Sequence, residues 1–443
     1  MKSAAVLTRG DRVLLDYVTA GTVADYLRED SAHLLQRLNP HLQWWNARYD
    51  FGLDPYAKST LGPIGPEVHA KDRLGRDITG INMASQDYLN LASHPDVKQA
   101  AHDAIDRYGV HSAGSATLMG NSQVSMTLAD ALSTFLKVSN CTLFPTGWAA
   151  GYGVIRALTR VHDHILIDAL AHACLIEGAR NSTKHVHRFQ HNDLRDLELK
   201  LKDVAANSAG AGILIVTESL FSMDSDTPDL QRMQDLARAA GATLLVDVAH
   251  DLGSLGPQGR GHLEMQEMLG KVDIVMGSFS KTFASNGGFV ATDHPALKQA
   301  LHFASGPLTF SNAISPVQAS VVLAALNIVA SEEGVALRRQ LMSNSLRLRD
   351  RLENKGLTVM GAPSAIVPVQ IGSSARSRLT CLNCGRRGAV VNLVEHPAVA
   401  QGSSRIRLQV MAGHTSAQID AFVSILGLAI EDTDAELLRL GLV

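Results

Sequence analysis

Short apolar runs alternate with helical patterns between residues 80 and 300, and this alternation constrains the fold more than any other feature of the chain. The apolar runs have the length of buried strands and occupy residues 142–144, 165–167, 213–216, 243–246, 273–276 and 288–291. Helical patterns separate several of them, at residues 171–180, 193–205 and 229–239. Such alternation is typical of an α/β fold, so we expect a mainly parallel central sheet with helices on both faces.

The patterns on either side of this region differ from it. Residues 1–75 hold one helical pattern near 23–38 and a Gly/Pro-rich stretch at 62–66, which predicts an N-terminal arm and a turn-rich segment. Residues 76–315 would form a large domain. A smaller α+β C-terminal domain is predicted for residues 316–443, from helical patterns at 316–330, 335–352, 376–386 and from 415, with strand-like runs at 366–371, 389–392 and 405–410.

Composition excludes several classes of protein. The net charge of −3 over 443 residues provides no basic field for nucleic acid or acidic lipid. The apolar run at the start of the chain breaks too early for a signal peptide, and no run of about 18 apolar residues predicts a membrane span. Four cysteines in a chain of this length do not suggest a disulfide framework, so we expect a reduced, cytoplasmic protein.

Asp247 follows the predicted strand 243–246 directly, in the sequence Val-Asp-Val-Ala-His that ends at His250. Ligands of parallel sheets bind beyond the carboxyl ends of the strands. A carboxylate driven to that semi-buried place needs a cationic partner, and a protonated pyridine nitrogen is one candidate. The alternative is a surface aspartate that opens the next turn.

Lys281 follows the predicted strand 273–276 after a run of small residues. It is the only charged residue from Ile274 to Thr292, which is unusual for a loop that faces solvent. A desolvated lysine can have a lowered pKa and form Schiff bases with carbonyl groups. The alternative is an ordinary solvated lysine.

Thr146, Gly147 and Trp148 follow the predicted strand 142–144 at the start of a helical pattern. Backbone N–H groups at a helix N-terminus attract anions such as phosphate, and Trp148 could pack against a flat ring. A simple helix cap with a core tryptophan is the alternative. With His172 after strand 165–167, these segments predict one cofactor site built from several strand ends.

These residues, in this order, resemble the α-oxoamine synthases, a branch of the fold-type I enzymes that depend on pyridoxal 5′-phosphate (PLP). The resemblance covers roughly residues 80–430. It rests on motifs that include Ser85–Pro95 (SQDYLNLASHP), Glu218–Asp224 (ESLFSMD), Gly256–Gly261 (GPQGRG), Ser278–Lys281 (SFSK) and Arg405–Leu408 (RIRL). It implies a fold-type I transferase that condenses an amino acid with an acyl thioester, loses CO2 and yields an α-amino ketone.

The resemblance also implies a role for each matching residue. Lys281 would carry PLP as a Schiff base and remove the α-proton of the substrate, Asp247 would face the pyridine nitrogen, and His172 would stack on the ring. His250 and Ser222 would bind the phenolic oxygen of the ring. The phosphate would be bound by Gly147, Trp148 and Ser278. Arg407 would bind the carboxylate of the substrate, with Gln86 near it. The implied assembly is a homodimer, with coenzyme A or an acyl-carrier protein delivering the acyl group.

Several departures from the family pattern surround the substrate rather than the cofactor. They include Val248 in place of a glutamate, Ser125 in place of a histidine and Ala116 in place of an arginine, and they leave the choice of amino acid and acyl chain open. Two other hypotheses about the function also remain open. The chain could catalyse a different fold-type I reaction, such as that of an aminotransferase or aldolase, or it could be a catalytically silent partner subunit. No metal site is expected, because Cys381 and Cys384 form one isolated pair.

Overall fold

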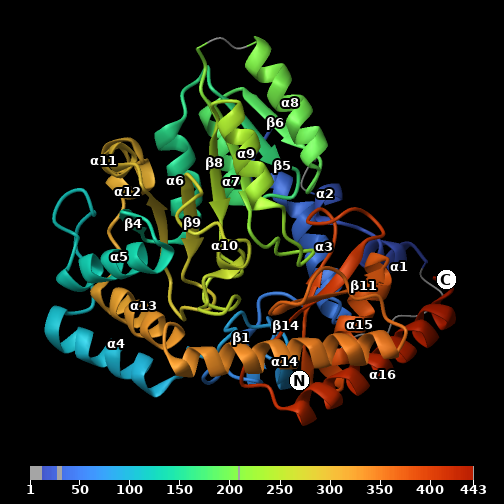
Figure 1. Ribbon diagram of the computed structural model, residues 1–443. Coiled ribbons are helices and arrows are strands. Elements are labelled where there is room, and N and C mark those ends of the chain that lie inside the picture. The colour runs from blue at the N-terminus through green and yellow to red at the C-terminus, as the bar shows by residue number, and fades with distance from the viewer. Residues whose placement is uncertain (1–11, 27–31, 208–209, 443) are drawn as a thin grey trace. The chain divides into compact units, whose positions relative to one another are not determined.

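The computed structural model describes residues 12–26, 32–207 and 210–442, and the chain forms two compact units (Figure 1). Unit 1 comprises Met1–Gln86, Met223–Ser225 and Gln340–Val443. Unit 2 comprises Asp87–Ser222 and Asp226–Arg339. The first eleven residues, on which the signal-peptide prediction rests, lie outside the described part.

Unit 2 is built on a seven-stranded sheet with the order β4-β10-β9-β8-β7-β5-β6. Its strands are β4 (Asn140–Phe144), β5 (His164–Asp168), β6 (His185–Phe189), β7 (Ile213–Glu218), β8 (Thr243–Asp247), β9 (Ile274–Ser278) and β10 (Gly288–Thr292). Strands β9, β8, β7, β5 and β6 pair in parallel, whereas β10 pairs antiparallel with β9 and with β4. The predicted mainly parallel sheet is confirmed.

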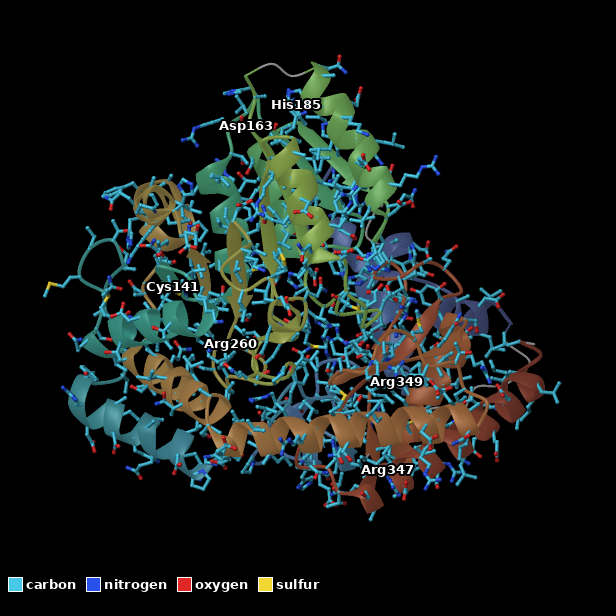
Figure 2. The ribbon with its side chains drawn as sticks, viewed as in Figure 1. Cys141, Asp163, His185, Arg260, Arg347 and Arg349 are labelled. Atoms are coloured by element: carbon cyan, nitrogen blue, oxygen red, sulfur yellow. The ribbon has the colours of Figure 1, made fainter. Side chains whose placement is uncertain are left out.

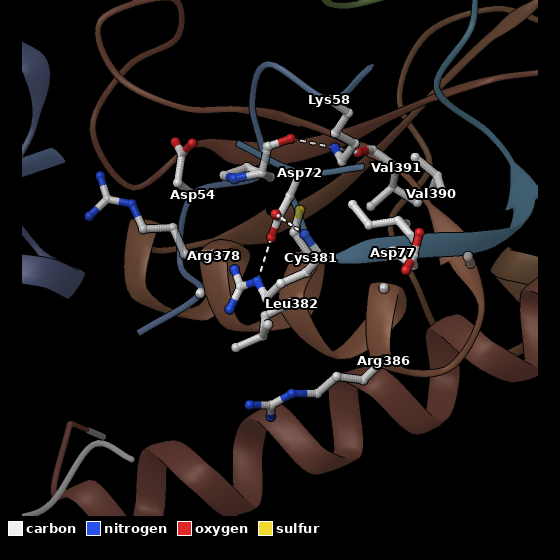
Figure 3. Close-up of a pocket in the computed structure, with 16 residues that line it drawn as sticks. Asp54, Lys58, Asp72, Asp77, Arg378, Cys381, Leu382, Arg386, Val390 and Val391 are labelled. Atoms are coloured by element: carbon white, nitrogen blue, oxygen red, sulfur yellow. Dashed lines mark hydrogen bonds and ion pairs between the residues drawn. The ribbon is translucent and has the colours of Figure 1, made fainter. Parts of the chain in front are cut away.

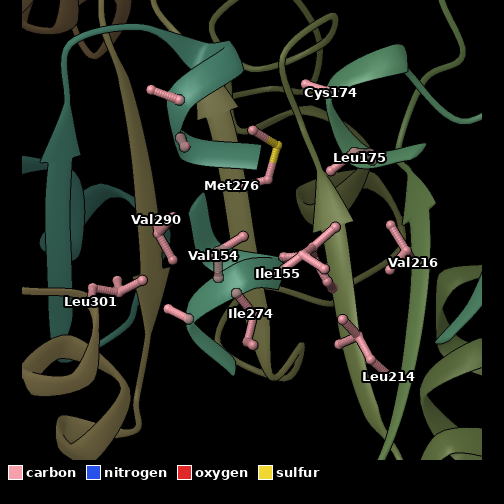
Figure 4. Close-up of a cluster of buried hydrophobic side chains, with 14 of the residues drawn as sticks. Val154, Ile155, Cys174, Leu175, Leu214, Val216, Ile274, Met276, Val290 and Leu301 are labelled. Carbon is pink, nitrogen blue, oxygen red and sulfur yellow. The ribbon is translucent and has the colours of Figure 1, made fainter. Parts of the chain in front are cut away.

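Helices cover this sheet, and apolar side chains fill the space between them and the strands. The helices are α4 (Pro95–Tyr108), α5 (Gln123–Leu136), α6 (Gly147–Leu158), α7 (Ala173–Ser182), α8 (Leu194–Asn207), α9 (Leu230–Ala239), α10 (Gly261–Met265), α11 (Pro295–Ala304), α12 (Gly306–Thr309) and α13 (Pro316–Val329). Figure 4 shows Val154 and Ile155 of α6 packed with Leu175 of α7, Leu214 of β7 and Met276 of β9. All five are almost fully buried, which explains why the strands read as continuous apolar runs.

Unit 1 combines both ends of the chain around two small sheets. Its helices are α1 (Arg12–Thr19), α2 (Val23–Tyr26), a 3₁₀ turn η1 (Gln36–Leu38), α3 (Asn39–Asp50), α15 (Ser374–Arg386) and α16 (Ser416–Leu440). One sheet has the order β1-β2-β3-β12, from β1 (Ser59–Thr60), β2 (Glu67–Lys71), β3 (Asp77–Asn82) and β12 (Ala389–Val390). The other has the order β11-β14-β13, from β11 (Ile366–Gly372), β14 (Ser404–Gln409) and β13 (Asn392–Val394).

The long helix α14 (Glu332–Asn354) begins in unit 2 and ends in unit 1. Two of its own arginines, which Figure 2 labels, bind neighbouring segments of unit 1. Arg347 binds the carboxylate of Asp420 on α16 through Nε, at 3.0 Å, and through Nη2. Arg349 donates to the carbonyl oxygens of Met360, at 3.0 Å, and Gly361, at 2.6 Å. The guanidinium groups therefore join α14 to α16 and to the turn before β11.

The compact units group the chain differently from the predicted segments. The N-terminal region shares a unit with the C-terminal region because β3 pairs in parallel with β12, more than 300 residues later. Helix α13 belongs to unit 2 because it packs on α4 and α5, so the boundary falls between residues 339 and 340 rather than at 316. The single helix predicted near 23–38 is wrong for residues 32–38: α2 covers Val23–Tyr26, but residues 32–35 are bends and turns, and η1 leads into α3, which has Pro40 in its first turn.

Two further properties of the described part concern the membrane and the cysteines. No single described helix is long and apolar enough to cross a membrane, although the bent pair α13 and α14 meets the length and composition criteria together. All four cysteines are buried free thiols in this structure.

Candidate functional site

A cavity of about 260 Å³ lies within unit 2, where β7, β8 and β9 end. Seven of the ten predicted site residues line it: Gly147, Trp148, His172, Asp247, His250, Ser278 and Lys281. They reach the cavity because parallel strands bring their carboxyl ends to one edge of a sheet. The structure therefore brings together residues that are up to 134 positions apart in the sequence.

Two carboxyl groups form the floor of the charged part of the cavity. Asp247 ends β8 and Glu218 ends β7, and the two are directly paired in the parallel register, so their side chains share one face of the sheet. Both are buried, with exposed fractions of 6% and 3%. Burial raises the pKa of each carboxyl, and the charge of Asp247 raises that of Glu218 further, whereas His172 and Lys281 lower that of Asp247.

His172 and Trp148 lie on another wall of the cavity. His172 caps α7, and its backbone N–H donates to Glu218 Oε1 at 2.6 Å. The rings of His172 and Trp148 meet edge to face, with centroids 5.9 Å apart. Two aromatic rings beside a carboxylate pair suit a flat, cationic heterocycle.

The start of α6 provides the anion-binding end of the cavity. Thr146 caps this helix by accepting a hydrogen bond from the N–H of Ala149 at 3.0 Å, and the N–H groups of Gly147 and Trp148 occupy its first two positions. Such N–H groups have no carbonyl partner within a helix, so they are available to a phosphate. The hydroxyls of Ser278 and Ser280 are 2.8 Å apart at the end of β9 and line the same cavity.

Gly147 shows how closely these two segments approach. A Cβ atom at this position would lie 2.4 Å from the Cβ of Ser278 and 2.6 Å from its hydroxyl oxygen. A side chain larger than hydrogen would therefore push α6 away from β9. The N–H donors of α6, the carboxyl groups of Asp247 and Glu218, and the amine of Lys281 line one cavity, and together they fit PLP, which carries a phosphate, a pyridine nitrogen and an aldehyde.

Three predicted residues do not line this cavity. Ser222 lies in the loop after β7, partly buried. Gln86 and Arg407 belong to unit 1, where Arg407 lies on β14 with its Nη1 atom 3.8 Å from the sulfur of Met223. In the described residues, no group of three or more His, Cys, Asp or Glu side chains is placed to hold a metal ion.

Comparisons with known proteins agree with this geometry. The family model for aminotransferase class I and II matches residues 78–426. The chain is 37% identical over 340 residues to 8-amino-7-oxononanoate synthase of Trichlorobacter lovleyi, covering 77% of this chain and 86% of that protein. It is 34% identical over 350 residues to the synthase of the same name from Geotalea daltonii, covering 79% and 88%.

Solved structures give the same result. The serine palmitoyltransferase of Sphingomonas wittichii superposes with a TM-score of 0.85 at 29% identity, over 91% of this chain and all of that one. A variant of the S. paucimobilis enzyme, solved with a bound PLP–myriocin aldimine, superposes with a TM-score of 0.84 at 28% identity, over 91% of this chain and all of that one. This chain belongs to the α-oxoamine synthase family.

The α-oxoamine synthase is thus a PLP-dependent enzyme of fold type I, as the sequence predicted. Cys174 and Glu218 line its cavity but were not among the predicted site residues, and Tyr88, which contacts the lining residue His250, was not predicted either. Glu218 carried the same signal as Asp247, an acidic residue that ends an apolar strand. Tyr88 could not be placed from its own segment, because its contact is with a distant residue: its hydroxyl lies 3.1 Å from His250 Nδ1, and both side chains are buried.

The synthase has a second cavity of about 260 Å³ within unit 1, shown in Figure 3. The charged residues on its walls include Asp54, Lys58, Asp72 and Arg76, and the Arg76 guanidinium is paired with Asp72 at 2.5 Å. Burial raises the pKa of Asp54 to about 6, although Arg48, Arg73 and Lys58 oppose the shift. None of the predicted site residues lines this cavity.

Proposed function

We propose that this enzyme condenses a small amino acid with an acyl thioester, with loss of CO2, to give an α-amino ketone. The observation that carries the proposal is the single cavity in which Lys281, Asp247 and His172 lie beside the N-terminus of α6. The names of its relatives support the reaction class, since both 8-amino-7-oxononanoate synthases and serine palmitoyltransferases are among them.

PLP, when bound, withdraws electrons from the α-carbon of an attached amino acid through its protonated ring. In our proposal, the N–H groups of Gly147 and Trp148 and the hydroxyl of Ser278 hold the phosphate. Asp247 holds the proton on the ring nitrogen, and the His172 ring covers one face. These contacts orient the ring because each binds a different part of it.

Lys281 has two roles in the proposal. Its amine first holds the cofactor covalently, and after the amino acid displaces it, the free amine removes the α-proton of the substrate. The Lys281 side chain is only partly exposed and lines the same cavity as His172 and Asp247. His250, oriented by Tyr88, and Ser222 would bind the phenolic oxygen of the ring.

Arg407 is the proposed partner of the amino acid carboxylate, with Gln86 near it. A guanidinium binds a carboxylate through two parallel hydrogen bonds, so it fixes the orientation of the α-carbon as well as supplying charge. The identity of the amino acid, and the delivery of the acyl group by coenzyme A or by a carrier protein, then depend on the residues around this arginine.

The test begins with the covalent link. Borohydride reduction of the holoenzyme should leave a pyridoxyl group on Lys281, identified by peptide mass spectrometry. A panel of amino acids, each combined with acyl thioesters, should then release free thiol and CO2 in equal amounts. Transamination of a keto acid without thiol release would refute the proposed reaction, and a holoenzyme with no pyridoxyl group on Lys281 would refute the proposed site.

A further inference from the structure

The thiol of Cys174 contacts the imidazole of His172 in the PLP cavity, and the proposed chemistry gives this contact no role. Both residues line the cavity, and both belong to unit 2. His172 caps α7, and Cys174 is the second residue of that helix. The sulfur of Cys174 lies 3.0 Å from Nδ1 of His172, within hydrogen-bonding distance. The fold therefore places a thiol beside the ring that covers the cofactor in our proposal.

The backbone decides which nitrogen of His172 carries the proton. The N–H group of Cys174 donates to Nδ1, with the two nitrogen atoms 3.3 Å apart. Because a backbone N–H can only donate, Nδ1 must be the unprotonated, accepting nitrogen. The proton of the neutral ring is then on Nε2, and a second proton on Nδ1 would break the cap of α7.

The thiol of Cys174 is a second donor to the same nitrogen. Its side chain is 2% exposed, and burial, together with the charge of Asp247, raises the pKa of the thiol above its ordinary value. The sulfur therefore keeps its hydrogen. Because Nδ1 is an acceptor, the S–H group is the donor in this contact.

Packing against α6 holds the sulfur of Cys174 in place. A Cβ atom at Gly151 of α6 would lie 2.7 Å from this sulfur and 3.2 Å from Cδ2 of Leu175. The backbone of α6 therefore passes close behind the thiol, and the absent side chain of Gly151 provides the space that the sulfur occupies. The thiol has no room to move away from His172 toward α6.

We propose that Cys174 is a positioning residue that keeps the ring of His172 neutral, with its proton on Nε2. The inference rests on the proposed function, in which His172 covers one face of PLP and Asp247 holds the proton on the pyridine nitrogen. A protonated pyridine attracts the π-electrons of a neutral imidazole but repels a charged imidazolium. Since two donors on Nδ1 oppose its protonation, the ring can cover the cofactor at lower pH than with the backbone N–H alone.

The first experiment locates the proton on His172. Holoenzyme containing histidine labelled with nitrogen-15 is studied by NMR as the pH is lowered, and the signals of His172 are assigned by their loss in His172→Gln. The wild type should show an unprotonated Nδ1 and a protonated Nε2. In Cys174→Ala, which keeps the backbone N–H but lacks the thiol, protonation of Nδ1 should move to higher pH by about half a unit or more. A neutral wild-type ring with its proton on Nδ1 would overturn the proposal.

The second experiment measures the PLP affinity of the apoenzyme as a function of pH, by fluorescence titration. Cys174→Ala should bind PLP as the wild type does above pH ~8, but about threefold or more weakly at the acidic end. Cys174→Ser, which restores a donor, should follow the wild type at every pH. Cys141→Ala is the matched control, because Cys141 is a buried thiol of β4 that does not line the cavity. An equal loss at every pH in Cys174→Ala, or a Cys174→Ser that behaves like Cys174→Ala, would show that the thiol only fills space and would overturn the proposal.

The other titratable groups around His172 are the same in all these variants. They are Asp168 at the end of β5 and, on the cavity wall, Glu218, Asp247, His250 and Lys281. Their protonation affects the PLP affinity of the wild type and of each variant alike. The difference between two pH profiles therefore reports the protonation of His172.

The outcomes separate this inference from the proposed function. If both titrations give the expected shifts but no amino acid yields thiol release, the reaction is wrong and the role of Cys174 stands. If thiol release occurs while the pH profiles of Cys174→Ala and the wild type coincide, the role of Cys174 is wrong and the reaction stands.

Discussion

At the scale of single residues, close approach and burial decide which substitutions this site tolerates. Gly147 and Ser278 come from different elements and meet at a distance that leaves no room for a methyl group. Glu218 and Asp247 meet as neighbours in a parallel register, where two buried charges of like sign repel each other. The first pair predicts the effect of one added methyl group, and the second predicts the effect of removing one charge.

Replacement of Gly147 by alanine should weaken PLP binding. The added methyl group would overlap Ser278, so α6 must move from the end of β9, and such overpacking costs about 1–3 kcal/mol. We expect PLP affinity, measured by fluorescence titration of the apoenzyme, to fall about tenfold or more. Gly385→Ala on α15, where a Cβ meets no atom within 4 Å, is the control and should bind PLP normally. Normal affinity in Gly147→Ala would show that this turn does not hold the phosphate.

Glu218 and Asp247 should differ sharply when each is replaced by its amide. Because burial and the charge of Asp247 both raise the pKa of Glu218, we expect its carboxyl to be protonated, and glutamine matches that state. Glu218→Gln should therefore retain activity within about threefold, whereas Asp247→Asn, which removes the proposed partner of the ring nitrogen, should lose about 100-fold or more. Steady-state thiol release measures both, and equal losses would mean that Glu218 acts as an anion.

At the scale of elements, buried ionic groups join segments that are far apart in the chain. In unit 1, Glu395 after β13 binds Arg378 of α15 and Arg48 of α3, and Tyr56 donates to it at 3.2 Å. In unit 2, His191 joins the end of β5 to the loop after β7, through Asp168 at 2.9 Å and Asp226 at 2.8 Å. Each cluster fixes a loop that ends a strand.

Removal of Glu395 should destabilise the protein strongly. Arg48 and Arg378 have exposed fractions of 0% and 1%, so without the carboxylate two buried guanidinium groups would lack their counter-charge. We expect Glu395→Ala to lower the free energy of unfolding by about 3–5 kcal/mol, measured by urea denaturation. Glu431→Ala, at an exposed position of α16, should change it by less than about 0.5 kcal/mol. A small effect in Glu395→Ala would mean that water satisfies the two arginines.

The His191 cluster should make stability depend on pH. Desolvation lowers the pKa of His191, but the hydrogen bonds to Asp168 and Asp226 outweigh it and raise the pKa to about 10. The folded-state value exceeds the unfolded value of about 6.5, so the stabilisation is complete below pH ~6.5 and is lost as pH rises through about 10. His191→Gln should cost about 2–3 kcal/mol at pH 6 and much less at pH 10, by denaturation at each pH. A difference that does not change with pH would contradict this.

At the scale of the whole molecule, the chain forms two units whose segments interleave in the sequence. The resemblance to the α-oxoamine synthases predicts that two such chains associate. We expect sedimentation velocity of the holoenzyme to give a mass of about twice 47.4 kDa, with no dependence on concentration in the micromolar range. A fully active species of 47.4 kDa would refute the homodimer.

The sequence by itself determined the central sheet and seven of the residues that line the cavity at its edge. Strands β7 and β8 are buried on both faces, so they require continuous apolar runs, and the polar residue that ends such a run must lie at the sheet edge where ligands bind. Asp247, Lys281 and Gly147 were identified in this way, and the order of the motifs supplied the family. The local sequence pattern was sufficient for these predictions because hydrophobic periodicity and polarity depend only on residues that are close together in the sequence.

Only the tertiary structure decided the contacts between distant segments. The pairing of β3 with β12, the Tyr88–His250 hydrogen bond and the cluster around Glu395 each join residues more than 100 positions apart. A cavity beside Arg407 likewise combines α2 and α3 with β13 and β14. No local pattern predicts these contacts. From the sequence alone, an arginine or a glutamate is expected at the surface, so its burial in an ion pair cannot be foreseen.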